Sequence, residues 1–168
     1  MTETVVRPAG EPVVAWRYWQ LLPGGVVLRS VTQKSVGWPP GRPLRAVCRG
    51  VGHPAPAEGC GCGIYGSETL EALREHPLCL APGVLLVGRV ALWGRVVADG
   101  HGYRGEHAYP AELLAVRDTV ADDSLDAVLE GLRAYGVAVG VTGLDQAVGD
   151  VSGTILAFQA MSGGTAVP

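Results

Sequence analysis

The stretch Val84-Leu-Leu-Val-Gly-Arg-Val-Ala-Leu-Trp-Gly-Arg-Val-Val-Ala98 decides the fold of this chain. Apolar residues occupy positions that face both sides of a sheet, which predicts a central strand covered on two faces. Gly88 and Gly94 interrupt the run and predict bends or β-bulges. Trp93 lies within the apolar run, so we expect its ring to be buried.

Antiparallel hairpins are predicted on both sides of that strand in the sequence. Residues 13–22 are rich in aromatic and β-branched residues, a Pro-Gly-Gly turn follows, and residues 26–31 return as a second strand. After the central strand, residues 99–102 turn the chain and residues 103–109 come back antiparallel. Pro110 is expected to stop that strand, because proline removes a backbone donor.

Helices are predicted to cover the sheet. Ser67 is expected to cap a short helix that runs to about His76, and Ser124 opens a second helix. Residues 137–139 then read as another strand. Apolar residues recur at helical spacing in the second helix and in a third one over residues 144–158: Leu125, Val128, Leu129 and Leu132, then Leu144, Val148, Val151, Ile155 and Phe158. This order predicts an α+β fold, with a mainly antiparallel sheet built from hairpins and covered mainly on one side by two or three helices.

The chain has 168 residues, 48% of them hydrophobic, which fits one domain. Residues 1–12 contain two prolines and no periodicity, so they are predicted to be a disordered lead-in. Residues 13–140 are predicted to form a single α+β domain with a metal-binding loop at 48–62. Residues 141–168 are predicted to be a C-terminal helix and a glycine-rich tail.

Metal-ligating residues gather in one short stretch. Cys48, His53, Cys60 and Cys62 lie within 15 residues and are separated by glycines and prolines. Three thiols and an imidazole suit a tetrahedral Zn²⁺ site. The stretch has almost nothing apolar to bury, so a metal is needed to order it. The alternatives are an iron-sulfur centre with the same ligands, a zinc site completed by Cys79 or His76 in place of His53, and unligated loop cysteines.

Charge and composition make several partners unfavourable. The formal net charge is -3, which gives no broad attraction for nucleic acid or anionic membranes. The N-terminus lacks a signal peptide and no apolar run reaches the length of a membrane span, so a cytoplasmic protein is predicted. Lys34 is the only lysine, and the abundance of Ala, Gly and Val is typical of a GC-rich bacterial genome.

Polar residues of the second hairpin are the other chemical candidates: His101, Tyr103, Arg104, Glu106 and His107. His107 and Glu106 are suited to acid-base chemistry, but adjacent strand residues point to opposite faces, so the two are not expected to share a site. We predict no catalytic residue and no organic cofactor, and favour a protein that is not an enzyme. The four tryptophans, Trp16, Trp19, Trp38 and Trp93, are predicted to be core and hairpin anchors.

Several motifs occur together along residues 13–140. They are the pair Trp16 and Trp19, Trp38-Pro-Pro-Gly41, Cys48 to His53, Cys60-Gly-Cys62-Gly-Ile-Tyr65, Val90-Ala-Leu-Trp93-Gly-Arg-Val96, Gly102-Tyr-Arg104 and Ala108-Tyr-Pro110. Together they resemble a family of small uncharacterised actinobacterial proteins with a C-x4-H-x6-C-x-C-G motif. The resemblance implies no activity, because no function is assigned to that family.

The sequence thus predicts a zinc-stabilised, non-catalytic binding or assembly protein. Residues 144–158 are predicted to contact a protein partner or to pair two copies as a homodimer, since Gly149 and Gly153 open a shallow groove for a second helix. The alternative is an iron-sulfur redox or sensor protein, or an accessory protein to a metal-dependent enzyme.

Overall fold

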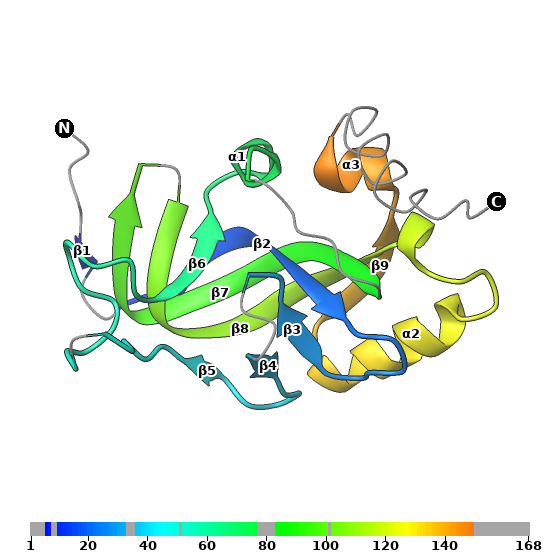
Figure 1. Cartoon of the computed structure of the whole chain (residues 1–168), viewed down its shortest axis with the longest axis horizontal. Coiled ribbons are helices and arrows are strands. Elements are labelled where there is room, and N and C mark those ends of the chain that lie inside the picture. Colours follow the sequence, from blue (N-terminus) through cyan, green and yellow to red (C-terminus); the bar gives the residue numbers. More distant parts are fainter. Residues whose placement is uncertain are drawn as a thin grey trace, which may run out of the picture.

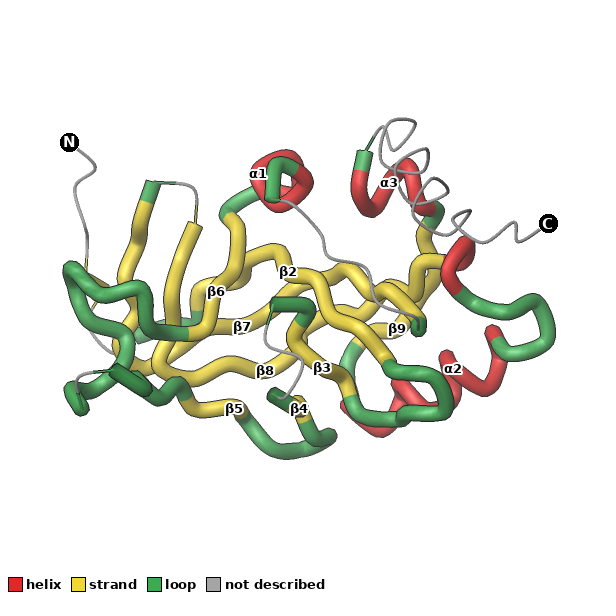
Figure 2. The backbone as a smooth tube through the Cα atoms, viewed as in Figure 1, coloured by secondary structure: helices red, strands yellow, loops and turns green. Residues whose placement is uncertain are grey.

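A twisted, mainly antiparallel sheet carries three short α-helices in the described part of the chain (Figures 1 and 2). The computed structural model describes residues 6–7, 10–32, 36–50, 52–76, 83–100 and 102–149. Nine strands belong to one sheet within these residues. The predicted α+β class is therefore confirmed.

The long hairpin of β7 (Val84–Asp99) and β8 (Gly102–Val116) is the centre of the sheet. β2 (Val13–Leu21) pairs antiparallel along the other edge of β7, so the predicted central strand is confirmed. Both predicted irregularities are present. One register shift lies between Arg89 and Val90, one residue beyond Gly88, and the other lies between Trp93 and Val96, where Gly94 has a φ of +74°.

β6 (Ile64–Ser67) pairs with both β8 and β2, so β2, β7, β8 and β6 form a closed ring of pairings. Gly66 faces the inside of this ring, because a Cβ atom there would lie 2.6 Å from the Cβ of Ala15. The sheet extends outward through short strands: β1 (Val6–Arg7) on β7, β3 (Leu28–Ser30) on β2, β4 (Gly37–Trp38) on β3, β5 (Leu44–Arg45) on β8, and β9 (Ala138–Thr142), which is parallel to β8.

Two hydrophobic clusters explain why β7 is apolar on both faces. Leu86, Val90 and Leu92 belong to the larger cluster, which packs against α2 (Leu125–Leu132), whereas Leu85 and Val87 belong to the smaller one. The smaller cluster packs against α1 (Leu70–Arg74) and α3 (Leu144–Val148). Figure 1 shows α2 on one side of the sheet and α1 and α3 on the other, so the expectation of a sheet covered mainly on one side is wrong. Alternating side chains of one strand thus serve two cores.

Local predictions near the termini of elements need correction. Val6–Arg7 of the expected disordered lead-in form β1 on the edge of β7. Ser67 lies in β6, and the helix that follows is capped by Thr69, whose Oγ1 accepts from the Ala72 amide at 3.1 Å. The chain enters the helix two residues later than predicted because β6 still pairs with β2 through Ser67.

Pro110 does not end its strand, because β8 continues to Val116. The residue is buried and pairs with Val90 beside a register shift. On its other edge β8 pairs with β5 through Ala108 and with β9 from Glu112 onward, so Pro110 falls between two partners. A proline is tolerated there because the ladder is already interrupted.

Trp93 is half-buried rather than a core anchor. Its ring stacks on His107 with centroids 5.9 Å apart and an interplanar angle of 16°. The prediction of a buried ring is wrong because Trp93 begins the register shift at Gly94, where the side chains leave the regular alternation. Trp19 and Trp38, by contrast, are buried and meet edge to face at 5.7 Å.

The C-terminal helix is shorter than its apolar pattern predicts. α3 ends at Val148, and Gly149 has a φ of +77°, so one unbroken helix from Leu144 to Phe158 is wrong at that glycine. Residues 150–158 lie outside the described residues. Ala147 is buried in the smaller cluster, and its carbonyl accepts from the Tyr18 hydroxyl at 2.6 Å.

No helix in the described ranges is long and apolar enough to cross a bilayer. The longest, α2, has 8 residues.

Candidate metal centre

The loop over residues 46–63, here called the metal loop, leaves and rejoins the sheet on the same strand. β5 precedes it and pairs with β8 at Ala108, and β6 follows it and pairs with β8 from Gly105 onward. The Ala46 amide also donates to the Glu106 carbonyl at 2.7 Å. Because both ends are fixed to neighbouring positions of β8, the loop folds back on itself at one end of the sheet (Figure 1).

This return brings the four predicted ligands together. The Cys48 Sγ lies 3.5 Å from the His53 Nε2 and 3.9 Å from the Cys60 Sγ. One ligand atom from each of these residues and from Cys62 fits within 4.8 Å of the others. The sulfur separation is far longer than the ~2.05 Å of a disulfide. The predicted Cys₃His group is therefore present as a cluster of three thiols, not joined by a disulfide, and one imidazole.

Glycines shape the turns that aim these ligands. Gly52 directly precedes His53 with a φ of +69°, and Gly59 directly precedes Cys60 with a φ of +71°. Both values lie in the left-handed region, which residues with a Cβ adopt only at a cost. A different constraint acts after the last ligand, because a Cβ on Gly63 would lie 3.0 Å from that of Arg104.

Arg104 holds the metal loop through hydrogen bonds to its backbone. It belongs to β8, is only 5% exposed, and its Nη1 donates to the carbonyl oxygens of Cys60 at 2.5 Å, Cys62 at 2.6 Å and Ala57 at 3.3 Å. One guanidinium thus fixes the backbone of two ligands. The sequence places Arg104 among the polar residues of the second hairpin and gives it no role at the metal loop. The only signal was its place in the Gly102-Tyr-Arg104 motif.

His53 is oriented by its own neighbour. Its Nδ1 lies 3.0 Å from the Pro54 carbonyl oxygen, which can only accept. A proton on Nδ1 makes this contact a hydrogen bond and leaves the Nε2 lone pair available to a metal. Nε2 is also the atom that lies beside the Cys48 Sγ.

The thiols modify each other's ionisation. A backbone hydrogen bond from Cys62 lowers the pKa of the Cys60 thiol, but hydrogen bonds with the Cys62 and Cys48 side chains, desolvation and the Cys48 charge outweigh it and raise that pKa overall. Neighbouring thiolates repel each other, so ionising all three thiols together requires a nearby cation. The chemistry of this donor set therefore fits a metal cation.

Other candidates lie apart from this group. The Glu106 Oε1 is 4.0 Å from the His107 Nδ1 and 3.7 Å from Arg45 Nη2, so the expectation that Glu106 and His107 do not share a site is wrong. The cause is the register shift opposite Glu106, where the Arg95 amide donates to Oε2 at 3.2 Å. His101 and Cys79 lie outside the described residues, and His76 follows α1 and is exposed.

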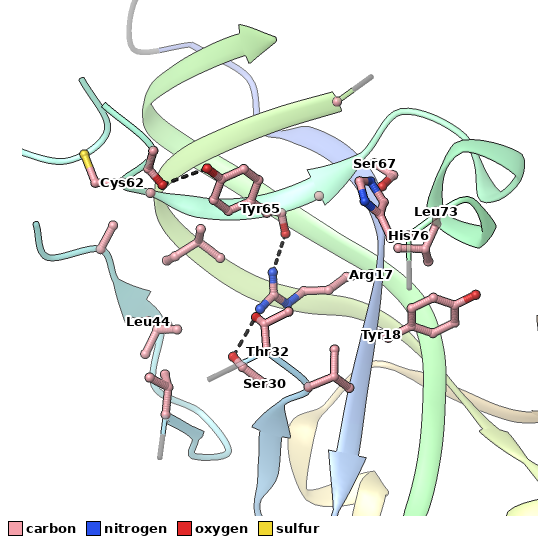
Figure 3. Close-up of a pocket in the computed structure, with 18 of the residues that line it drawn as sticks. Arg17, Tyr18, Ser30, Thr32, Leu44, Cys62, Tyr65, Ser67, Leu73 and His76 are labelled. Carbon is pink, nitrogen blue, oxygen red and sulfur yellow. Dashed lines mark hydrogen bonds between the residues drawn. The ribbon is translucent and has the colours of Figure 1, made fainter. Parts of the chain in front are cut away.

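A pocket of about 880 Å³ opens beside the metal loop, a feature that sequence reasoning missed. Gly61, Cys62 and Gly63 form part of its wall, together with β6, β2 and the end of β3. Figure 3 shows Arg17 in the middle of the lining, between Tyr65 and Ser30. The Tyr65 hydroxyl donates to the Gly61 carbonyl at 2.7 Å, so one residue joins the pocket to the metal loop.

No protein-family model matches this chain, and neither a curated protein nor a solved structure is significantly similar to it. The resemblance to the family of small actinobacterial proteins thus rests on the motifs alone. What the fold and the site define is an α+β protein with a possible Cys₃His metal centre.

Proposed function

We propose that this protein is a non-catalytic binding protein whose structure is completed by one Zn²⁺ bound to Cys48, His53, Cys60 and Cys62. The separation of the donor atoms carries this proposal. In a tetrahedron with metal-ligand distances of about 2.0 to 2.3 Å, the ligand atoms lie about 3.3 to 3.8 Å apart. The observed 3.5 Å and 3.9 Å are close to those values, and all four donor atoms lie within 4.8 Å of one another, so a contraction of the longer separations would close the shell around one ion.

A shell of four protein ligands favours a structural role. It leaves no coordination position for water or substrate, which a catalytic zinc needs. The ion would supply the free energy that orders the loop, where Ala55 and Pro56 are the only buried residues among 46–50 and 52–63. Backbone ordering costs ~1 to 2 kcal/mol per residue, and structural zinc binds with ~10 to 16 kcal/mol.

The alternative is that the same four residues bind an iron-sulfur cluster. Its ligands would sit on different iron atoms and hence farther apart than ligands of a single ion. The fit of all four donor atoms within 4.8 Å supports the single ion.

Elemental analysis of the full chain, purified without added metal, tests the proposal. We expect about one zinc per chain, lost in Cys60→Ser and in His53→Gln. The matched controls are Cys79→Ser and His76→Gln, which change the same residue types in the alternative ligands and should keep the metal. Iron with sulfide, an absence of metal, or metal loss in the controls would overturn the assignment.

The partner of such a protein remains a proposal. A homodimer through residues 144–158 is the sequence-based candidate, although the described part of that segment packs on its own sheet through Ala147. Light scattering at micromolar concentration, with and without residues 150–168, tests whether the chain pairs.

A further inference from the structure

The pocket beside the metal loop has an unusual balance of charge. Its charged or titratable basic residues are Arg17, Arg45, Arg49 and His76, and no Asp or Glu lines it among the described residues. Arg45 and Arg49 are exposed, so solvent screens their charges. Arg17 alone brings a positive charge into the interior of the lining.

Arg17 has no counter-charge among the residues that the structure describes. Its Nη1 donates to the Tyr65 carbonyl and its Nη2 to the Ser30 Oγ at 3.1 Å, whereas its Nε is buried without a hydrogen-bond partner. A guanidinium has five N–H donors, so these bonds leave donors unused. No carboxylate of the described residues forms an ion pair with it.

The surroundings compensate this charge only in part. The Arg17 Cζ lies 5.0 Å from the centre of the Trp38 ring, a cation-π contact. Burial lowers the pKa of Arg17 to about 10, so the group stays protonated at neutral pH. Arg17 is half-buried, and a partly desolvated charge without an ion pair among the described residues is costly, so an anionic ligand would lower that cost.

Apolar and aromatic side chains also line the pocket: Trp16, Tyr18, Val36, Leu44 and Ile64. A volume of about 880 Å³ lies in the range of small-molecule sites, which combine an apolar lining with a few polar groups. The Arg17 Nε is buried, but Nη1 and Nη2 each donate one hydrogen bond and keep a second N–H group, and two such N–H groups match one carboxylate through parallel hydrogen bonds. A free phosphate would need further buried donors and would leave the apolar walls unused.

We infer that this pocket binds an organic carboxylate with an apolar body, whose carboxylate pairs with Arg17. The inference deepens the proposed function and rests on it through the wall at residues 61–63, which the metal would order. Cys62 lies in that wall, and Figure 3 shows its sulfur turned away from Arg17. The metal centre thus shapes the pocket without contacting the ligand carboxylate.

Three probes test the chemistry on the full-length, zinc-loaded protein: 2-naphthoate, its neutral amide 2-naphthamide, and inorganic phosphate. Isothermal titration calorimetry should show one saturable site for 2-naphthoate, with the amide at least about tenfold weaker, since hydrogen bonds to charged groups are worth that much. Phosphate alone should not bind. Equal affinity for the amide, preference for phosphate, or no saturable binding of 2-naphthoate up to millimolar concentration would overturn the inference.

Arg17→Met should weaken 2-naphthoate at least about tenfold and leave the amide unchanged. The control is Arg95→Met, which removes an exposed arginine outside the pocket and should bind 2-naphthoate normally. If Arg17→Met does not fold, the comparison of acid and amide on the unmodified protein decides the matter.

Metal content separates the two proposals. A zinc-loaded chain that does not bind 2-naphthoate contradicts the pocket inference alone. A chain without metal that still prefers 2-naphthoate over the amide contradicts the proposed zinc centre alone.

Discussion

The central hairpin and the metal loop are ordered by different forces. β7 and β8 carry fully buried residues such as Leu86, Val90 and Leu113, whereas the described part of the loop buries only Ala55 and Pro56. Burial of apolar surface, at roughly 25 cal/mol per Å², stabilises the first region. The second has ligand atoms, left-handed glycines and the Arg104 guanidinium instead. Apolar burial stabilises the central hairpin, whereas the proposed zinc ion would order the metal loop, so the two regions should respond differently to loss of the metal.

Removing the metal should have the largest effect and should be confined to the loop. We expect EDTA treatment to abolish amide protection over residues 46–63, because nothing apolar replaces the lost ligand bonds. Hydrogen exchange measured by mass spectrometry should find β7 and β8 unchanged. Added zinc should restore the protection, and a simultaneous loss of protection in both regions would remove the contrast between them.

Truncating a core tryptophan should lower the stability of the sheet without releasing the metal, the reverse of what metal removal should do. Trp19 is fully buried and packs on Trp38, so Trp19→Ala should lower the free energy of unfolding by about 3 to 5 kcal/mol while the chain keeps its metal. Trp93→Ala is the matched comparison. Because Trp93 is half-buried and stacks on His107, we expect a loss of about 1 to 2 kcal/mol.

Urea unfolding with metal analysis checks both variants. Equal losses in the free energy of unfolding for Trp19→Ala and Trp93→Ala would contradict the expectation that the more buried ring contributes more to stability.

Removing the contacts between Arg104 of β8 and the metal loop should have a smaller effect, seen as weaker zinc binding. Arg104→Met removes the donor shared by the Cys60, Cys62 and Ala57 carbonyls. Groups that orient ligands typically change metal affinity by about 10- to 100-fold, so we expect a loss in that range. Competition with a chelating indicator measures it, and Arg95→Met should leave zinc affinity unchanged. An unaltered zinc affinity in Arg104→Met would show that the metal ligands order the loop without help from Arg104.

The sequence predicts the features that are determined by residues close together in the chain. The apolar run of β7 and its glycine bulges follow from neighbouring residues, and the Cys₃His group that could hold a metal follows from donor type and spacing. Thr69 rather than Ser67 caps the helix because strand pairing extends farther than propensity indicates. The strand continues through Pro110 also because of pairing with distant strands. β5 and β9 leave a gap in the pairing of β8 at this residue, and a proline is tolerated there.

The features that the sequence could not predict depend on long-range contacts. Arg104 reaches carbonyls 42 to 47 residues earlier in the chain, and Arg17 becomes part of a pocket only when β6 closes the ring of strands. Glu106 and His107 share a site because of a bulge on the opposite strand. No periodicity or spacing around these residues encodes those neighbours.

X-ray absorption at the zinc edge of the purified full-length protein tests the central claim most directly. The account predicts a single zinc with three sulfur neighbours at ~2.3 Å and one nitrogen neighbour at ~2.0 to 2.1 Å, the set that Cys48, Cys60, Cys62 and His53 provide. A shell of oxygen and nitrogen atoms without sulfur, or iron atoms bridged by sulfide in place of zinc, would contradict it.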